Sequence, residues 1–340
     1  MRRCIPLAAL AVLCLAAVAP NAFAQAPEKP KITIAVGGKS LFYYLPLTIA
    51  VQNGYFKAEG LDVELQDFPG GARALQALLG GSADVTSGAY EHTITQQAKG
   101  QSIEAIFLQG KYSAIELVMS KAKADKYKSP ADLKGMKIGV TAPGSSTNMF
   151  VNNLLAKQGL KPDDVAIIGV GATAGAVAIM KKGEIDAIAN LDPVISQLEM
   201  DGTIVPVVDT RTAKGMQDVY GGAYAAGVIY APVDFAKKYP NTAQAVVNAM
   251  VRALRFIQTS TPEQIVAAVP ADYYTDRALY KAALEKNLDT WKHDGSISRE
   301  AGETVTKDLK TFDPTVAKAN IDVAKTVNMT FQQKTAQKYK

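Results

Sequence analysis

The sequence predicts an α/β protein of two similar lobes with a mainly helical C-terminal part. Three observations lead to this prediction. Short apolar strands alternate with helices from Ile32 to Asn190. One strand-helix unit recurs further along the chain. The chain has 340 residues, of which 48% are hydrophobic and 20% charged, so it can bury one large core or two medium ones.

The first 24 residues have the pattern of a secretory signal peptide. Arg2 and Arg3 form a positive start, an apolar run extends from Ile5 to Val18, and Asn21 to Ala24 ends in an A-x-A type cleavage site. We therefore expect residues 1–24 to be removed on export and the mature chain to begin near Gln25. The apolar run is too short for a comfortable membrane span.

Both cysteines of the chain, Cys4 and Cys14, lie in this leader. The mature chain is then expected to have no disulfide, no catalytic thiol and no cysteine metal site. Leu13 stands where a lipoprotein signal needs a small residue, so we expect no lipid anchor at Cys14. Loss of Arg2 and Arg3 lowers the formal charge from +5 to +3. This mild excess is spread along the chain, which argues against a nucleic-acid partner.

The first lobe is expected to begin with a strand-helix-strand-helix-strand unit, an order that indicates a parallel sheet. Its elements are a buried strand at Ile32 to Val36, a loop at Gly37 to Ser40, a helix through Pro46 that ends at Asn53-Gly54, a strand at Leu61 to Leu65, a helix at Ala72 to Leu79 and a strand at Ala83 to Thr86.

The stretch from Lys137 to Gly159 predicts a second copy of the start of this unit. A strand at Lys137 to Val140 is followed by a loop of small residues at Ala142 to Thr147 and by a helix that Gly159 ends. The backbone N–H groups and hydroxyls of this loop suit an anion or a carboxylate or sulfonate group. The alternative is that Ser145 or Ser146 merely caps the helix.

A repeat supports the binding interpretation. Asp62 to Leu65 corresponds to Asp164 to Ile167, and Gly81 to Val85 corresponds to Gly183 to Ala187, both at an offset of 102 residues. Because two segments share one offset, chance is the weaker explanation.

Two further strands are expected to connect the lobes. Ala114 to Met119 would lead into the second lobe and Ala225 to Tyr230 out of it, with hinges near Gly110 to Ser113 and Tyr230 to Val233. We therefore predict a first lobe of residues 31–111 and 233–340 and a second lobe of residues 112–232. The part of the chain after Val233 is expected to be mostly helical.

Ligands of parallel sheets bind beyond the carboxyl ends of the strands, where loops meet the starts of helices. This rule selects the loops Gly37 to Phe42, Thr86 to Glu91, Ala142 to Thr147 and Asn190 to Pro193. If the lobes face each other, all four converge on one cleft, which is a favoured place for a small molecule. The candidate ligand-binding residues are Ser40, Phe42, Tyr43, Ser87, Gly88, Tyr90, Gly144, Ser145, Ser146, Thr147, Asn190 and Asp192.

Some of these residues suit a structural role equally well. Phe42 and Tyr43 can pack in the core at the start of a helix, and Asp192 followed by Pro193 can form a turn. Lys39 is a candidate charge partner for an anion, although a lysine there is more often simply solvated.

The sequence contains no convincing catalytic constellation. His92 and His293 are its two histidines, and no paired nucleophile accompanies His92 beside Glu91. Two histidines without cysteine or spaced carboxylates do not build a zinc site. Gly169 to Gly175 resembles a dinucleotide-binding loop, but its glycine spacing is wrong. We therefore expect no enzyme, no cofactor and no metal.

Several motifs match one known family in order and spacing from Ile32 to Tyr239. They are Tyr44 to Ala50, Asn53 to Val63, Gly71 to Asp84, Leu133 to Val140 with Gly144-Ser145-Ser146, and Val233 to Pro240. Together they resemble the nitrate/sulfonate/taurine group of periplasmic substrate-binding proteins of ABC importers, a group that also includes proteins similar to thiamine-pyrimidine synthases.

The resemblance implies a type II periplasmic binding protein fold, with two βαβαβ lobes, a cleft between them and a helical C-terminal extension. It also implies a monomeric periplasmic protein that closes over a small solute and delivers it to an inner-membrane ABC permease. The four loops above would face the ligand.

Two departures from the family narrow the expected solute. Asn190 to Pro193 lacks the tryptophan that many relatives carry there, which argues against a sulfonate or taurine. No arginine lies in the four loops, and Arg73 is the nearest. We therefore expect a small organic monoanion or a polar aromatic nutrient held by hydroxyls, tyrosines and helix dipoles.

The resemblance leaves two alternative functions open. The family also resembles pyrimidine-forming enzymes of thiamine biosynthesis on the same fold, but those would be cytosolic and cysteine-bearing. A ligand-sensing transcription regulator with this fold would need a helix-turn-helix, which the N-terminal sequence lacks.

Overall fold

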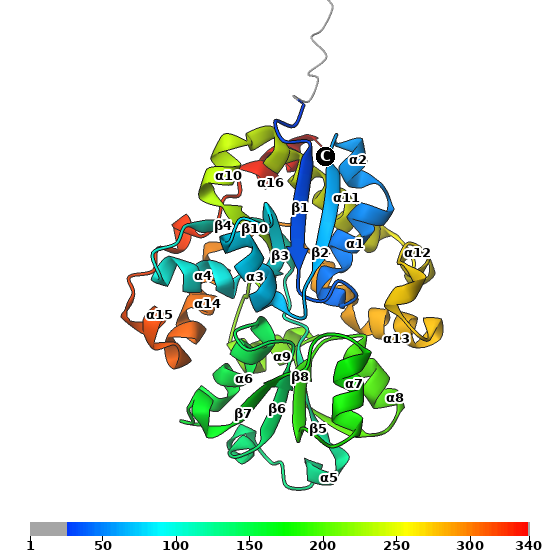
Figure 1. The fold of residues 1–340 in the computed structure, drawn as a ribbon, viewed down its shortest axis with the longest axis vertical. Coiled ribbons are helices and arrows are strands. Elements are labelled where there is room, and N and C mark those ends of the chain that lie inside the picture. The colour runs from blue at the N-terminus through cyan, green and yellow to red at the C-terminus, as the bar shows by residue number, and fades with distance from the viewer. Residues whose placement is uncertain (1–25, 339–340) are drawn as a thin grey trace, which may run out of the picture.

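The computed structural model describes residues 26–338 and consists of two α/β lobes (Figure 1). The predicted signal peptide at residues 1–24 lies outside this range. The first lobe is built on a five-stranded sheet with the order β2-β1-β3-β10-β4, and the second on a sheet with the order β7-β6-β8-β5-β9. The strands of the first sheet are β1 (Lys31–Val36), β2 (Asp62–Asp67), β3 (Val85–Ala89), β4 (Ile103–Gly110) and β10 (Gly227–Pro232). Those of the second are β5 (Glu116–Ser120), β6 (Lys137–Val140), β7 (Ala166–Gly169), β8 (Ala187–Asn190) and β9 (Ile204–Asp209).

The two sheets have equivalent topology. Strands β1, β2 and β3 are parallel, as are β6, β7 and β8. One antiparallel strand completes the interior of each sheet, β10 between β3 and β4 and β5 between β8 and β9. The repeated strand-helix unit predicted from the sequence is therefore confirmed as the parallel part of each lobe.

The strand β10 belongs to the first sheet, because it pairs with β3 and β4. The return of the chain to the first lobe therefore falls before Gly227, between the end of the second sheet and β10. The predicted boundary between residues 232 and 233, and the second hinge at Tyr230 to Val233, lie too late in the chain. The strand pattern at Ala225 to Tyr230 was predicted, but its sheet was not.

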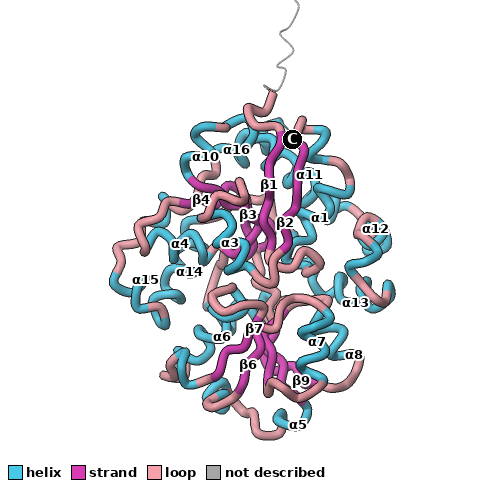
Figure 2. Tube along the Cα trace, in the orientation of Figure 1, coloured by secondary structure: helices cyan, strands magenta, loops and turns pink. Residues whose placement is uncertain are grey.

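Helices cover both sheets, and most of the C-terminal ones surround the first lobe (Figures 1 and 2). The first lobe begins with α1 (Leu45–Gln52), α2 (Tyr55–Ala58), α3 (Gly71–Leu79) and α4 (Glu91–Ala98). The second lobe has α5 (Lys121–Ala124), α6 (Ser146–Ala156), α7 (Ala174–Lys181), α8 (Val194–Met200) and α9 (Ala213–Tyr220). The extension has α10 (Val233–Lys238), α11 (Pro240–Thr259), α12 (Pro262–Ala267), α13 (Arg277–Asn287), α14 (Arg299–Phe312), α15 (Pro314–Lys318) and α16 (Thr330–Lys338).

Short 3₁₀ turns join several of these elements. They are η1 (Phe42–Tyr44), η2 (Pro130–Leu133), η3 (Pro162–Asp164), η4 (Ala271–Tyr273), η5 (Leu288–Trp291) and η6 (Val323–Lys325).

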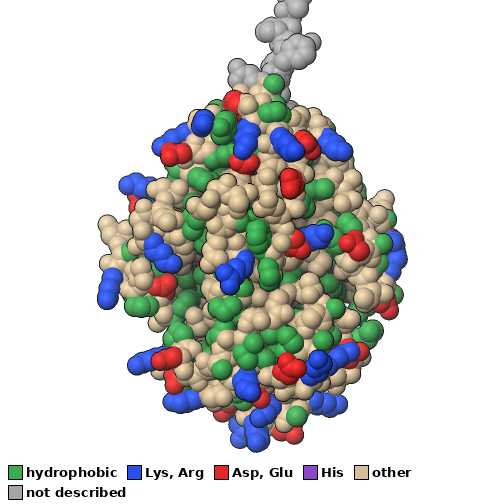
Figure 3. Space-filling view, in the orientation of Figure 1, with side chains coloured by type: hydrophobic (Ala, Val, Ile, Leu, Met, Phe, Trp, Pro, Cys, Tyr) green, Lys and Arg blue, Asp and Glu red, His purple; other side chains and the backbone are tan. Residues whose placement is uncertain are grey.

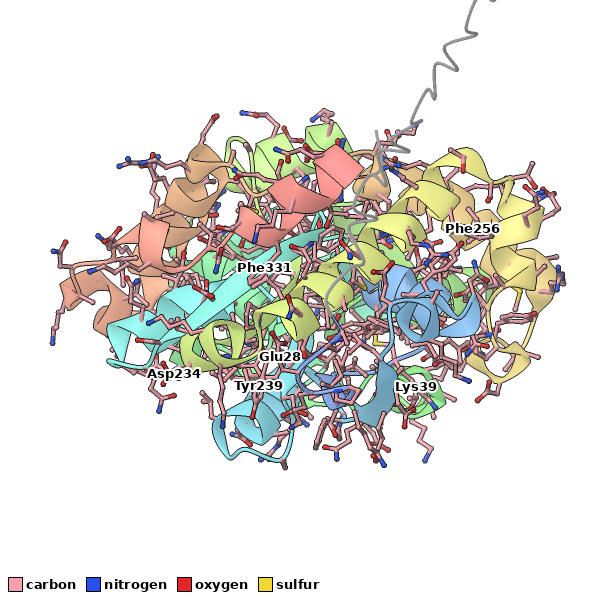
Figure 4. All side chains as sticks on the ribbon, turned by 90° about the horizontal axis from the view of Figure 1, so that it is seen from above. Glu28, Lys39, Asp234, Tyr239, Phe256 and Phe331 are labelled. Atoms are coloured by element: carbon pink, nitrogen blue, oxygen red, sulfur yellow. The ribbon has the colours of Figure 1, made fainter. Side chains whose placement is uncertain are left out.

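The longest helix, α11, holds the extension onto the first lobe. Its apolar residues are buried, and it packs against α1, α2, α16 and β4. The carboxylate of Glu28, near the start of the described chain, accepts the N–H groups of Asn241 and Thr242 at 3.0 and 2.9 Å and so caps this helix (Figure 4). The extension also reaches the second lobe, because α14 packs against both α4 and α6.

Charge is dispersed over the surface. Figure 3 shows basic and acidic side chains interspersed over one face of the molecule. Within residues 26–338, no helix is both long and apolar enough to cross a membrane. Nor does this part of the chain bring together three or more His, Cys, Asp or Glu side chains that could hold a metal ion.

Candidate functional site

The two lobes are in direct contact at three of the four predicted loops and at His92, directly after the fourth. The N–H of Phe42 donates to the carbonyl of Asp192 at 3.0 Å. At Gly70 the backbone of the first lobe approaches the second so closely that a Cβ there would lie 2.8 Å from the Cβ of Ala142. Because loops from both sheets touch, the structure is a closed arrangement of the lobes.

Ser145 links the lobes through its hydroxyl. It occupies the N-cap position of α6, yet its side chain forms no hydrogen bond to that helix. Instead, Oγ of Ser145 accepts the N–H of Ala72, in the first turn of α3 on the other lobe, at 3.0 Å. Its side chain is only 1% exposed. The simple capping alternative therefore does not describe Ser145, while Ser146 is the first residue of α6 and is partly exposed.

Gly144 makes a second link, with His92 at the start of α4. Its φ of +83° is unfavourable for any residue with a Cβ. The carbonyl of Gly144 lies 3.3 Å from Nε2 of His92, and Nδ1 of His92 lies 3.1 Å from the hydroxyl of Tyr230. A carbonyl can only accept, so Nε2 carries the proton and Nδ1 accepts from Tyr230. Burial lowers the pKa of His92 to about 4, which keeps the ring neutral near pH 7.

Three predicted residues form hydrogen bonds inside their own lobes. The hydroxyl of Ser87 donates to Gln109 at 2.7 Å. Oγ1 of Thr147 accepts the N–H of Thr141 at 3.1 Å, which fixes the loop before α6. The amide of Asn190 donates to the carbonyl of Gly171 at 3.1 Å. These bonds hold the loops in shape, and a direct contact of these three residues with a ligand stays a prediction.

The predicted aromatic residues divide into two groups. Phe42 packs edge-on against Tyr280, with ring centroids 4.6 Å apart, and Tyr90 bonds to the hydroxyl of Thr326 at 2.6 Å inside the first lobe. Tyr43, by contrast, has a buried hydroxyl without a hydrogen-bond partner among the described residues. Gly88 leaves room for the ring of Tyr230, since a Cβ there would lie 2.9 Å from it.

Asp192 is part of a buried charge network that sequence reasoning missed. One of its oxygens accepts from Arg211 at 3.1 Å and from Asn287 of α13 at 2.8 Å. Arg211 also pairs with Glu116 at 2.7 Å and with Asp209 at 2.9 Å. Burial and the charge of Asp192 raise the pKa of Glu116 to about 10, although Arg211 opposes this. The guanidinium of Arg211 is thus engaged by carboxylates of the protein itself.

A second buried group at the lobe junction consists of Glu91 with Tyr43, Tyr220 and Tyr224, and we call it the Glu91–tyrosine cluster. The hydroxyl of Tyr224 donates to Oε1 of Glu91 at 3.1 Å. The rings of Tyr220 and Tyr224 stack with centroids 4.0 Å apart. Burial raises the pKa of Glu91 to about 7. Sequence reasoning selected its neighbour Tyr90 instead.

An open cavity of about 230 Å³ also lies between the lobes. Ser40 lines it from the first lobe, Thr173 and Gln197 from the second, and Tyr273 from the extension. The amino group of Lys39, labelled in Figure 4, lies 5.6 Å from the ring centroid of Tyr273. Of the candidate ligand-binding residues, Ser40 is the one that lines this cavity.

Two lobes with the same strand order, joined by crossing segments and closed over loops from the ends of their parallel strands, define a two-lobed periplasmic binding protein fold. The chain belongs to the NMT1/THI5-like family, whose model matches residues 42–265. Both the predicted fold class and the predicted family are thus confirmed.

Solved structures and named relatives agree with this assignment. A structure from Bordetella bronchiseptica RB50 is 52% identical, with a TM-score of 0.89, and the match covers 93% of this chain and 99% of that one. The alkanesulfonate-binding protein SsuA of Xanthomonas axonopodis pv. citri shares the fold at 20% identity, with a TM-score of 0.67 and coverage of 88% and 98%.

Two kinds of named relatives match by sequence. A candidate binding protein of Brucella abortus is 27% identical over 82% of this chain and 81% of its own length. A 4-amino-5-hydroxymethyl-2-methylpyrimidine phosphate synthase of Saccharomyces cerevisiae is 23% identical over 67% of each chain.

Proposed function

We propose that this protein is the periplasmic solute-binding component of an ABC importer, which binds a small organic anion or a polar aromatic nutrient by hinge closure. The main support is the contact between loops of the two lobes at Ala72–Ser145, His92–Gly144 and Phe42–Asp192. A solute that touches both lobes favours the closed state, because it gains contacts there that the open state lacks. The signal-peptide pattern supports export, and an inner-membrane permease would receive the solute.

An enzyme like the yeast synthase is the alternative, since that protein matches two thirds of the chain. The site residues favour binding over catalysis. His92 is held neutral between Tyr230 and Gly144, and no serine, threonine or cysteine of the described residues is hydrogen-bonded to its ring. Formation of 4-amino-5-hydroxymethyl-2-methylpyrimidine phosphate by the purified protein would instead support the synthase alternative.

A thermal-shift screen tests the binding proposal. Sulfonates, nitrate, aromatic carboxylates, amines and pyrimidines would be added singly, since a ligand that binds the native state raises the melting temperature. Calorimetry on each hit would then compare the wild type with the double variant Ser145→Ala/Ser146→Ala. We expect at least severalfold weaker binding in the variant, because it loses the hydroxyl that joins the lobes.

The matched control is Ser129→Ala, which removes a capping hydroxyl of η2 in the second lobe. It should bind as the wild type does. Equal affinity in the wild type and the double variant would contradict the role of this loop in closure.

A further inference from the structure

Glu91 is a buried carboxylate with one unsatisfied oxygen. It is the first residue of α4, at the carboxyl end of β3, and its side chain is 2% exposed. Oε1 accepts from Tyr224, whereas Oε2 has no hydrogen-bond partner among the described residues. No lysine or arginine of the described chain forms an ion pair with it. Burial of a carboxylate oxygen without a hydrogen-bond donor costs folding free energy, unless a bound molecule supplies the donor.

Three tyrosines from separate segments interact with this carboxylate. Burial, followed by the charge of Glu91, raises the pKa values of Tyr43 in η1, Tyr220 at the end of α9 and Tyr224 in the returning segment. Tyr43 is 8% exposed, and its hydroxyl also has no hydrogen-bond partner among the described residues. Two polar atoms at the lobe junction therefore lack partners, and both can accept a hydrogen bond.

The positive side chains near the junction are engaged elsewhere. Arg211 is surrounded by carboxylates of the second lobe. The amino group of Lys157 donates to the carbonyl of Val219. That of Lys111 donates to the carbonyl of Lys292. Asp308 of α14 adds further negative charge, because it raises the pKa values of Tyr220 and Tyr224 as Glu91 does.

A cavity touches this cluster at Tyr224, in the returning segment. It has a volume of about 340 Å³ and is lined by Tyr112, Met216 and Tyr224 among others. Tyr224, which donates to Glu91, therefore borders this cavity.

We propose that the solute carries a cationic nitrogen group, an ammonium or an amidinium, which donates a hydrogen bond to Oε2 of Glu91 and lies among the rings of Tyr43, Tyr220 and Tyr224. A carboxylate with tyrosine side chains beside it is suited to such a group through a charge-assisted hydrogen bond and cation–π attraction. This inference rests on the proposed solute-binding function and narrows its ligand. It selects a polar aromatic or other amine over an organic anion.

Matched pairs of compounds test this inference. Amines and amidines would be screened by thermal shift beside carboxylates of the same shape, for example benzamidine with benzoate and phenethylamine with 3-phenylpropionate. We expect cations to raise the melting temperature and their carboxylate partners not to do so. In Glu91→Gln the affinity for the cationic hits should fall at least about tenfold, as expected when one charge-assisted hydrogen bond is lost.

Two variants guard against a loss of folding. Glu104→Gln changes another buried carboxylate of the first lobe, which accepts from Asn328, and should bind the cations as the wild type does. Tyr43→Phe keeps the ring, removes the unpartnered hydroxyl and should weaken binding severalfold.

Binding of carboxylates instead of cations, or cation binding that Glu91→Gln leaves unchanged, would overturn the inference while leaving solute binding in place. Absence of any cationic hit would also overturn it. A hit that is unaffected by Glu91→Gln but weakened by Ser145→Ala/Ser146→Ala would identify a different group as the ligand's partner in the same closed cleft.

Discussion

The substitution Glu91→Gln should remove a pH dependence from the stability of the ligand-free protein. Burial raises the pKa of Glu91 from an ordinary 4.5 to about 7. Between these values the native state holds a proton that the unfolded state releases. The contribution of Glu91 to stability is therefore present below pH 4.5 and is lost as the pH rises through about 7. A shift of this size corresponds to about 3 kcal/mol of unfolding free energy.

Urea unfolding of both proteins at a series of pH values measures this effect. The wild type should lose about 3 kcal/mol relative to Glu91→Gln between acidic pH and about pH 8. Taking the difference cancels the contributions of groups common to both proteins, such as His92 and Glu116. A difference that stays constant with pH would refute the reasoning, because the carboxyl would then titrate alike in both states.

Four further predictions concern the junction of the lobes. Ser145→Ala/Ser146→Ala should weaken solute binding by about 1 kcal/mol per lost hydrogen bond, measured by calorimetry, without lowering the melting temperature of the ligand-free protein appreciably. Gly144→Ala should destabilise the protein by about 1–2 kcal/mol, because Gly144 has a positive φ. Urea unfolding measures this loss, and an unchanged stability would show that the positive φ is not required. Arg211→Met should cost about 3–5 kcal/mol, since the buried carboxylate of Asp192 loses its cation; an equally stable variant would contradict the network. Binding of a cationic solute should weaken about tenfold from about pH 8 to about pH 6 as Glu91 becomes protonated. Burial raises the pKa of Asp308 to about 6, and its charge acts on the same tyrosines, so Asp308→Asn is the control. This variant should keep most of the pH dependence of binding. Binding by the wild type that does not change with pH would argue against Glu91.

The strands and helices of the two lobes could be predicted from the sequence because their signals are local. The stretch from Lys137 to Gly159 is an example, with β6 at Lys137–Val140, α6 at Ser146–Ala156 and a positive φ at Gly159. The repeat gave the common topology, since it pairs segments of the same hydrophobic pattern. The sheet to which β10 belongs could not be predicted, because a short apolar strand fits either sheet equally well.

The partners of the site residues depend on contacts between distant segments, which no local pattern encodes. Ser145 stands at a helix start, and only the approach of α3 from the other lobe shows that its hydroxyl accepts from Ala72. Arg211 and Glu91 were missed for the same reason. A signal for Glu91 was present, namely a carboxylate directly after the predicted cleft residue Tyr90, but its burial and its tyrosine neighbours depend on the fold.

The movement of the lobes can be measured with two spin labels. The sequence has no cysteine after Cys14, so cysteines introduced at Arg73 in the first lobe and Lys161 in the second, both exposed, would carry the labels. Double electron–electron resonance then gives the distance distribution between them, with and without a solute that raises the melting temperature. The central claim is that the lobes close over this solute. We predict a broad distribution without solute and a single narrow peak at saturation, at the distance of the closed structure. An unchanged distribution while calorimetry shows the solute bound would contradict closure.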